Sequence, residues 1–306
     1  MSSPMDQTIN PPETFAKVTW PCPLCGGVEQ RELYPDTLEG DLPSFGYDFT
    51  PDHMRTYRVV FCPLCQHGFC SPRPRQLWQQ YEEIQDPTYL HWQKDRIASA
   101  RQVLRRMLRY RSSGRLLDIG CATGDFLSMA SAHYSAEGLE LSGWAAEIAR
   151  SRGLKIHSCT LADFHPDQPY DLLTLWGVIE HFEDPLAEIH RMQHLLRPGG
   201  MVCLWIGDIA SWLARFFGKD WWYIQGQHLQ IFSRKSLRES FRRGGFQEVW
   251  IGRYSYVTTL QSIARSLGRY PVLGLAAKRL VSPRGIGQWT VTLKLPGEMF
   301  AIFKKT

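Results

Sequence analysis

The chain has 306 residues, 43% of them hydrophobic, and a formal net charge of +5. This length suits one full α/β domain and a smaller module, and the composition is that of a globular protein that can bury a core. The first residues lack the apolar segment of a signal peptide, and no stretch approaches the roughly 20 apolar residues that span a bilayer. We therefore expect a cytoplasmic protein without a transmembrane segment.

The N-terminal part differs in composition from the remainder. Residues 1–16 form a polar tail, and residues 17–75 are rich in proline, glycine, cysteine and aromatic residues but poor in helical periodicity. We interpret residues 17–75 as a small β-rich module with a strand at 59–61. Apolar residues at helical spacing predict a helical linker over 76–110, which precedes a larger domain over 111–306.

Strand and helix patterns alternate along the larger domain. The predicted strands cover residues 115–119, 136–141, 155–159, 170–176, 201–206, 246–251 and 298–304. The predicted helices cover residues 125–133, 143–152, 185–196 and 233–244, and residues 257–284 are expected to be mixed and mainly helical. Short apolar strands between helices are typical of a doubly wound, Rossmann-like α/β sheet, here of seven strands. Its ligand is expected beyond the carboxyl ends of the strands.

A glycine-containing loop follows the first predicted strand of this domain. Asp118 precedes Gly120 by two residues, and Gly124 completes a G-x-x-x-G spacing. Glycines at a strand-to-helix turn let a ligand approach the backbone closely, and the helix N-terminus offers unpaired N–H groups. The spacing differs from the G-x-G-x-x-G of dinucleotide folds. Glu140 lies at the end of the second strand, where a carboxylate can accept both hydroxyl hydrogens of a ribose.

Four motifs occur in order along the domain: D-I-G-C-A-T-G at 118–124, G-L-E-L-S at 138–142, Y-D-L-L-T-L-W-G-V-I-E-H-F-E-D-P at 170–185 and L-L-R-P-G-G at 195–200. Together they resemble a class I S-adenosylmethionine (SAM)-dependent methyltransferase over roughly residues 110–250. The resemblance implies that the cofactor is SAM and that its methyl group is transferred to an acceptor.

The resemblance also implies roles for individual residues. The implied cofactor-binding residues are Asp118, Gly120, Gly124, Glu140, Asp163, Trp176 and Gly177. The two loop glycines would line the methionine part of SAM with Asp118 beneath them, and Glu140 would bind the ribose hydroxyls. Asp163 matches the acid that meets the adenine amine, although an aspartate before an aromatic residue is also an ordinary helix cap. Trp176 and Gly177 match positions near the methionine moiety and the methyl group.

Two Cys-Pro-Leu-Cys pairs lie in the N-terminal module. They comprise Cys22 with Cys25 and Cys62 with Cys65, and 36 residues lie between the pairs. Four thiolates from two such knuckles make a closed tetrahedral zinc site, and metal is favoured over disulfides in a cytosolic chain. Four protein ligands leave no open coordination position, so we predict a structural zinc ion.

The sequence around the second cysteine pair carries a further resemblance. Residues 57–65, Gly68-Phe69 and residues 71–74 are similar to the N-terminal zinc-binding domain of bacterial methyltransferases of the sugar C-methyltransferase type. The chain departs from that pattern at Gln66-His67, where a glycine often follows the cysteine. This resemblance implies a sugar, a glycan precursor or another small molecule as acceptor.

Two histidines are candidates for a general base. His181 follows the fourth strand of the domain beside Glu180, and His228 lies in a Q-H-L-Q-I-F-S segment after an aromatic loop. An imidazole can accept a proton near neutral pH, although each histidine could equally be a packing or capping residue. Relatives that hold a divalent metal here use an earlier acid, and Gly177 occupies its place. We therefore do not predict a catalytic metal.

Two other functions compete with small-molecule methylation. The cysteine module and the arginines between residues 96 and 115 would also suit an RNA methyltransferase with a zinc finger, but the modest charge excess and the scarcity of lysine argue against nucleic acid. The third candidate is a SAM-binding protein that has lost catalytic activity. The intact glycine loop and Glu140 argue against it, because a site that is no longer used is expected to decay.

Overall fold

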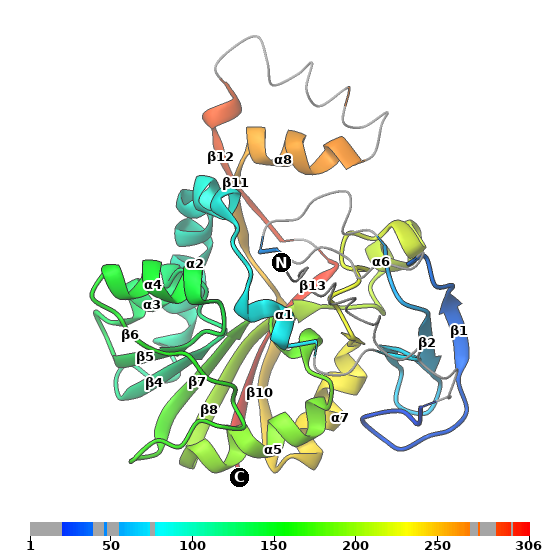
Figure 1. Ribbon diagram of the computed structural model, residues 1–306, viewed down its shortest axis with the longest axis horizontal. Coiled ribbons are helices and arrows are strands. Elements are labelled where there is room, and N and C mark those ends of the chain that lie inside the picture. Colours follow the sequence, from blue (N-terminus) through cyan, green and yellow to red (C-terminus); the bar gives the residue numbers. More distant parts are fainter. Residues whose placement is uncertain are drawn as a thin grey trace, which may run out of the picture.

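A seven-stranded mixed sheet forms the centre of the structure (Figure 1), which is a computed structural model that describes residues 20–38, 46–47, 55–73, 77–269, 275, 286–294 and 296–306. The strands are β4 (Arg115–Ile119), β5 (Ser135–Leu139), β6 (Lys155–His157), β7 (Tyr170–Trp176), β8 (Leu196–Gly207), β10 (Phe246–Arg253) and β13 (Glu298–Lys305). Their spatial order is β10-β13-β8-β7-β4-β5-β6. This order confirms the predicted Rossmann-like sheet of seven strands.

The sheet is parallel from β6 to β8 and antiparallel at its other edge. β13 runs antiparallel between β8 and β10, so the last strand of the chain is inserted into the sheet beside its centre. β8 begins at Leu196, five residues before the predicted start, and follows α5 without an intervening loop. The first six residues of β13 are buried and the last two are not. This burial explains why the strand appears as an apolar run in the sequence.

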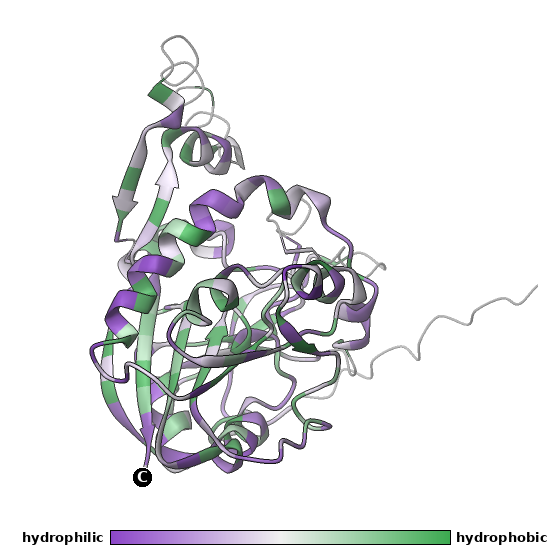
Figure 2. Cartoon of the chain, turned by 90° about the vertical axis from the view of Figure 1, so that its left-hand side faces the viewer, coloured by the Kyte–Doolittle hydropathy of each residue, from purple (hydrophilic) through white to green (hydrophobic). Residues whose placement is uncertain are grey.

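Helices cover both faces of the sheet, as the continuous burial of residues along strands such as β4 and β7 requires. They are α2 (Gln93–Met107), α3 (Asp125–Ala130), α4 (Gly143–Ser151), α5 (Pro185–Leu195) and α7 (Arg234–Arg243). Leu116 packs with residues of α2, α3 and α4, whereas its neighbour Leu117 packs with residues of α5 and α7. Figure 2 shows the apolar residues along the strands and the polar ones on the outer helix faces.

The N-terminal module forms a second sheet with a strand from the larger domain. Its strands are β1 (Arg31–Tyr34), β2 (Val59–Cys62), β3 (His67–Cys70) and β9 (Gln230–Ile231), in that spatial order. His67 is fully buried at the junction, where its Nε2 lies 2.9 Å from Gln230 Oε1 and its ring packs on Phe69 and Phe232. The module and the α/β domain therefore share a sheet and a core.

The predicted helical linker is divided into three pieces. They are α1 (Gln79–Glu82), the 3₁₀ helix η2 (Pro87–Trp92) and α2. The Asp86 side chain accepts a hydrogen bond from the Tyr89 N–H, and Pro87 occupies the first helical position. Proline cannot continue a preceding helix but is favoured as the first residue of a new one, so the chain restarts there.

The structure corrects the start of the range 257–284, which was expected to be mainly helical. Residues Tyr256–Thr259 form strand β11, which pairs antiparallel with β12 (Thr290–Leu293), and helix α8 (Leu260–Ser266) follows. Three consecutive β-branched residues favour the strand, and Asp95 on α2 anchors it by accepting hydrogen bonds from the Thr258 hydroxyl and the Thr259 N–H. Beyond residue 269, this range is described only at residue 275.

Short helices complete the described part of the chain. They are η3 (Ile179–His181), α6 (Trp212–Phe217), η4 (Gly218–Asp220), η5 (Leu267–Arg269) and η6 (Ile286–Gln288). None of the helices within the described ranges combines the length and the hydropathy needed to cross a bilayer.

Candidate functional site

The glycine loop connects β4 to α3 at the carboxyl edge of the sheet. Gly120, Ala122 and Gly124 all adopt positive φ values, +67°, +48° and +79°. A Cβ atom at Gly120 would lie 2.7 Å from Val178 Cγ2. The loop thus lies against the segment after β7, and a side chain at Gly120 would fill the space where the two meet.

Gly124→Ala is expected to lower the free energy of unfolding more than Gly153→Ala does. The two glycines have φ values of +79° and +78°, so the left-handed strain of alanine, ~1–2 kcal/mol, is common to both. A Cβ at Gly124 would also lie 2.3 Å from Leu154 Cδ1, whereas nothing lies within 4 Å at Gly153. Overpacking should add about 1–3 kcal/mol at Gly124 only. Urea unfolding measures the difference, and equal losses would contradict this account.

Glu140 is the residue that organises this loop. Its Oε2 accepts a hydrogen bond from the Ala122 N–H, and its Oε1 accepts from the Ser142 N–H, both at 2.8 Å. Tyr47, from the N-terminal part of the chain, also donates its hydroxyl to Glu140 Oε1 at 2.8 Å. Burial raises the pKa of Glu140, and these donors oppose that rise. The carboxylate is therefore held in place at the edge of the cavity described below.

Asp118 lies buried beneath the loop, where the sequence placed it. Its Oδ1 accepts a hydrogen bond from the Thr174 hydroxyl at 2.6 Å, and burial raises its pKa to about 7. Its Oδ2 has no hydrogen-bond partner among the described residues. Asp118 can thus accept one further hydrogen bond from a ligand.

The other predicted cofactor residues lie on two segments of the same edge. Asp163 is exposed in a turn, where its carboxylate accepts from the Thr160 hydroxyl at 2.5 Å. Trp176 ends β7 and contacts Phe126, with ring centroids 4.7 Å apart. Gly177 follows at φ +70°. Asp163, Trp176 and Gly177 line the same cavity as Gly120, and their roles toward the cofactor remain predictions.

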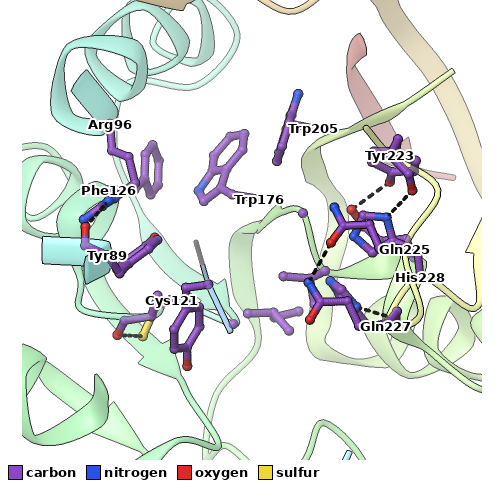
Figure 3. A pocket seen from close by; sticks show the side chains of 18 of the residues that line it. Tyr89, Arg96, Cys121, Phe126, Trp176, Trp205, Tyr223, Gln225, Gln227 and His228 are labelled. Atoms are coloured by element: carbon purple, nitrogen blue, oxygen red, sulfur yellow. Dashed lines mark hydrogen bonds between the residues drawn. The ribbon is translucent and has the colours of Figure 1, made fainter. Parts of the chain in front are cut away.

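A single cavity of about 1470 Å³ connects these residues with a group of aromatic side chains. Six of the seven predicted cofactor residues line it, and Gly124 does not. Figure 3 shows Trp176 and Trp205 in the space between Tyr89 and His228. Pockets for one small ligand usually measure ~300–1,000 Å³, so this cavity has room for a cofactor and an acceptor together.

Both predicted histidines line the cavity, and the structure brings them together. Their ring centroids lie 4.9 Å apart, although 46 residues separate them in the sequence. His228 Nδ1 lies 2.7 Å from the Tyr223 carbonyl oxygen, and His181 Nδ1 lies 2.8 Å from the Gln227 carbonyl oxygen. A carbonyl oxygen can only accept, which assigns the hydrogen of His228 to Nδ1 and its lone pair to Nε2. His181 Nδ1 also lies 2.8 Å from the Tyr81 hydroxyl, which can donate to it, so its contacts do not fix the tautomer of His181.

Glu180 lies beside the two histidines. Tyr223 donates its hydroxyl to Glu180 Oε1 at 2.7 Å, and burial raises the pKa of Glu180 to about 7. Desolvation lowers the pKa of His181 to about 4, and the nearby carbonyls of Gln227 and Gly177 oppose this. His181 is therefore unprotonated at neutral pH and can accept a proton.

The ligand atoms of Glu180, His181 and His228 lie within 4.8 Å of one another. A carboxylate and two imidazoles are groups that first-row divalent ions bind. A catalytic metal was not predicted, because Gly177 occupies the place of the earlier acid, and His228 was not considered as a ligand at that point. A measurement of the metal content has to consider this cluster as well as the cysteines.

The four cysteines of the two knuckles also converge. Cys22 Sγ lies 3.5 Å from Cys65 Sγ, Cys25 Sγ lies 3.5 Å from Cys62 Sγ, and all four sulfurs lie within 4.8 Å of one another. The backbone of Gly27 packs directly against this cluster, since a Cβ there would lie 3.2–3.3 Å from two of the sulfurs. Four sulfurs at Zn–S distances of ~2.3 Å would have similar separations, so the cluster fits a tetrahedral zinc ion.

Sequence reasoning missed two residues of the cavity. Tyr47 contacts Glu140 from 93 residues away in the sequence, and no local pattern indicates that contact. Glu298, the first residue of β13, is buried and accepts a hydrogen bond from Trp205 Nε1 at 2.9 Å. A carboxylate at the start of an apolar strand was a signal that could have identified Glu298.

Comparison with known proteins agrees with this geometry. A family model described as a methyltransferase domain matches residues 89–250. A chloroplastic 2-methyl-6-phytyl-1,4-hydroquinone methyltransferase of Oryza sativa subsp. japonica is 28% identical over 62% of this chain and 59% of its own length. A ubiquinone biosynthesis O-methyltransferase of Xylella fastidiosa is 31% identical over 34% of this chain and 46% of its own length. The chain thus spans about half the length of the curated relatives that it matches.

Among solved structures, a SAM-dependent methyltransferase of Thermotoga maritima, described as a possible histamine N-methyltransferase, is 23% identical. The match has a TM-score of 0.49 and covers 71% of this chain and 94% of the other. The family model matches more than half of the chain. The chain therefore belongs to this methyltransferase-domain family.

Proposed function

We propose that the chain transfers the methyl group of SAM to a small-molecule acceptor bound beside Trp176 and Trp205. One observation carries this proposal: a single cavity extends from Gly120 and Glu140 at the cofactor end to Trp222 and Tyr254 at the other. Methyl transfer requires the acceptor atom to lie in line with the methyl group, and holding both ligands in one cavity supplies much of the rate.

The cofactor end of the cavity fits SAM. Glu140 is fixed by backbone donors where it can accept from ribose hydroxyls, and Asp118 Oδ2 can accept from a ligand donor. Gly120 leaves the backbone open to close approach. SAM, when bound there, supplies an electrophilic methyl group.

Glu140→Ala is expected to weaken SAM binding about 100-fold. Two hydrogen bonds to a charged group contribute at least ~1.5 kcal/mol each, which together corresponds to about two factors of ten in affinity. Isothermal titration of SAM into both proteins measures the change. Glu147→Ala, on the exposed face of the next helix, is the matched control. Unchanged affinity in Glu140→Ala would remove Glu140 from the ribose role.

His181 or His228 is proposed to take the proton from the acceptor atom as its lone pair attacks the methyl carbon. The new bond forms to that carbon while the carbon–sulfur bond breaks, and the electron pair of that bond stays on sulfur. The lone pair assigned to His228 Nε2 and the positions of both rings on the cavity wall support this role.

A small-molecule acceptor agrees better with the structure than RNA does. Several of the arginines near α2 are used within the protein: Arg106 lies over the Trp250 ring at 4.0 Å, and Arg111 pairs with Asp171 at 3.0 Å. These paired side chains offer little charge to a phosphate backbone, which leaves the exposed Arg101, Arg105 and Arg109. Aromatic walls can pack against a sugar or another small ring system, so a sugar acceptor stays within the proposal.

We also propose that one zinc ion per chain is bound by Cys22, Cys25, Cys62 and Cys65, and that its role is structural. The convergence of the four sulfurs supports the metal. The four-thiolate set supports the structural role, because no coordination position is left for a substrate.

A further inference from the structure

We infer that the acceptor end of the cavity binds a positively charged nitrogen of the acceptor, held by Glu298 against the rings of Trp205 and Tyr254. The inference assigns a substrate class, amines and quaternary ammonium compounds, to the proposed function and rests on it. Its first support is the charge of the cavity. Five aspartates and five glutamates line the cavity against three arginines, whereas the chain as a whole carries a net charge of +5. A cleft of one sign concentrates ligands of the opposite sign.

Several of these carboxylates already have strong partners. Asp125 pairs with Arg96 at 2.8 Å, and Glu188 pairs with Arg191. Asp95 accepts hydrogen bonds from the β11–α8 segment. These groups stabilise the fold, and they do not require a ligand.

Glu298 and Glu180 are different. Glu298 is 5% exposed and Glu180 is 1% exposed, and neither forms an ion pair with any residue in the described ranges. Each accepts one hydrogen bond from an aromatic side chain, and Glu180 Oε2 has no partner among the described residues. A buried carboxylate without a counter-ion is costly, and a cationic ligand would offset that cost.

Aromatic rings complete the proposed subsite. The Trp205 and Tyr254 centroids lie 5.3 Å apart with their planes tilted by 42°, and Glu298 contacts the indole nitrogen of Trp205. Rings of this kind attract cations to their faces, most strongly where water is excluded. Glu298 meets the indole at its N–H edge, and both rings and the carboxylate line the same cavity, so together they favour a nitrogen cation over a neutral group of the same shape.

Trp205 also links the proposed subsite to the expected methyl position. Its Cζ3 lies 2.8 Å from the position of a Cβ on Gly177, while its Nε1 donates to Glu298 at the other end of the indole. A cation at Glu298 would thus lie about one indole length from the place where the resemblance puts the methyl group. Acceptors with phosphate groups would meet the carboxylates of the cavity and are disfavoured.

The test uses the full chain saturated with S-adenosylhomocysteine and measures probe binding by isothermal titration. The probes are choline, benzyltrimethylammonium and the neutral isosteres in which carbon replaces nitrogen. We expect a cationic probe to bind about tenfold or more tightly than its isostere. Glu298→Gln should remove most of that preference, whereas Glu188→Gln, which changes a cavity carboxylate that already has an arginine partner, should retain it.

The inference is overturned if neither cation binds, if the isosteres bind equally well, or if Glu298→Gln keeps the full preference. Thermal melting and the affinity for S-adenosylhomocysteine show whether the variant is folded; if it is not, the comparison of cation and isostere on the unmodified chain decides. Normal binding of S-adenosylhomocysteine without cation preference refutes this inference alone. Failure of the unmodified chain to bind S-adenosylhomocysteine or SAM refutes the proposed function.

Discussion

Replacing Cys22 and Cys25 with serine is expected to abolish zinc binding and to unfold the N-terminal module. Within the described residues the module has three short strands of its own, and the four cysteines belong to the core that it shares with the α/β domain. Structural zinc contributes roughly 10–16 kcal/mol in small metal-dependent domains, so its loss should unfold the module even though one edge is packed on the larger domain. Elemental analysis should give one zinc per chain before the substitution and none after it, and limited proteolysis should then cut the module.

Cys159→Ser is the matched control for this experiment, because Cys159 is partly buried and lies outside the sulfur cluster. It should leave the zinc content and the protease resistance unchanged. A double variant that retains its fold without zinc would refute the structural role. Metal that remains bound to the double variant would instead point to Glu180, His181 and His228.

Substituting the true base among His181 and His228 is expected to lower kcat by roughly 10²–10⁴-fold, which is the usual contribution of a positioned general base. Asparagine is the appropriate replacement, since its amide N–H₂ can still donate to the backbone carbonyl that each Nδ1 contacts. SAM affinity, measured by titration, should stay near that of the unmodified chain. The acceptor for the assay would be sought first among amines.

His190→Asn is the control, because His190 is exposed on α5 away from the cavity wall. Nearly full kcat in both His181→Asn and His228→Asn would show that neither imidazole is the base and that catalysis depends on proximity. A loss of SAM affinity equal to the loss of kcat would indicate instead that the substitution had damaged the cofactor end of the cavity.

Local patterns in the sequence were sufficient for the positions of the central strands along the chain, the glycine loop and the two cysteine knuckles. Apolar runs such as 170–176 have to be buried on both faces, so their composition alone identifies them as central strands. The motif around Gly120 can be identified from a few residues, because a tight turn depends only on the backbone conformations that these residues can adopt. The same is true of each cysteine pair, whose two sulfurs are placed by one turn.

Contacts between distant segments were decided by the tertiary structure. β11 became a strand because β12 pairs with it and Asp95 holds it, and neither partner is near in the sequence. Tyr47 reaches Glu140, and Glu298 reaches Trp205, across 93 residues in each case. Cross-strand pairing and the burial of a polar group depend on which surfaces meet after folding, and periodicity within one segment carries no information about that choice.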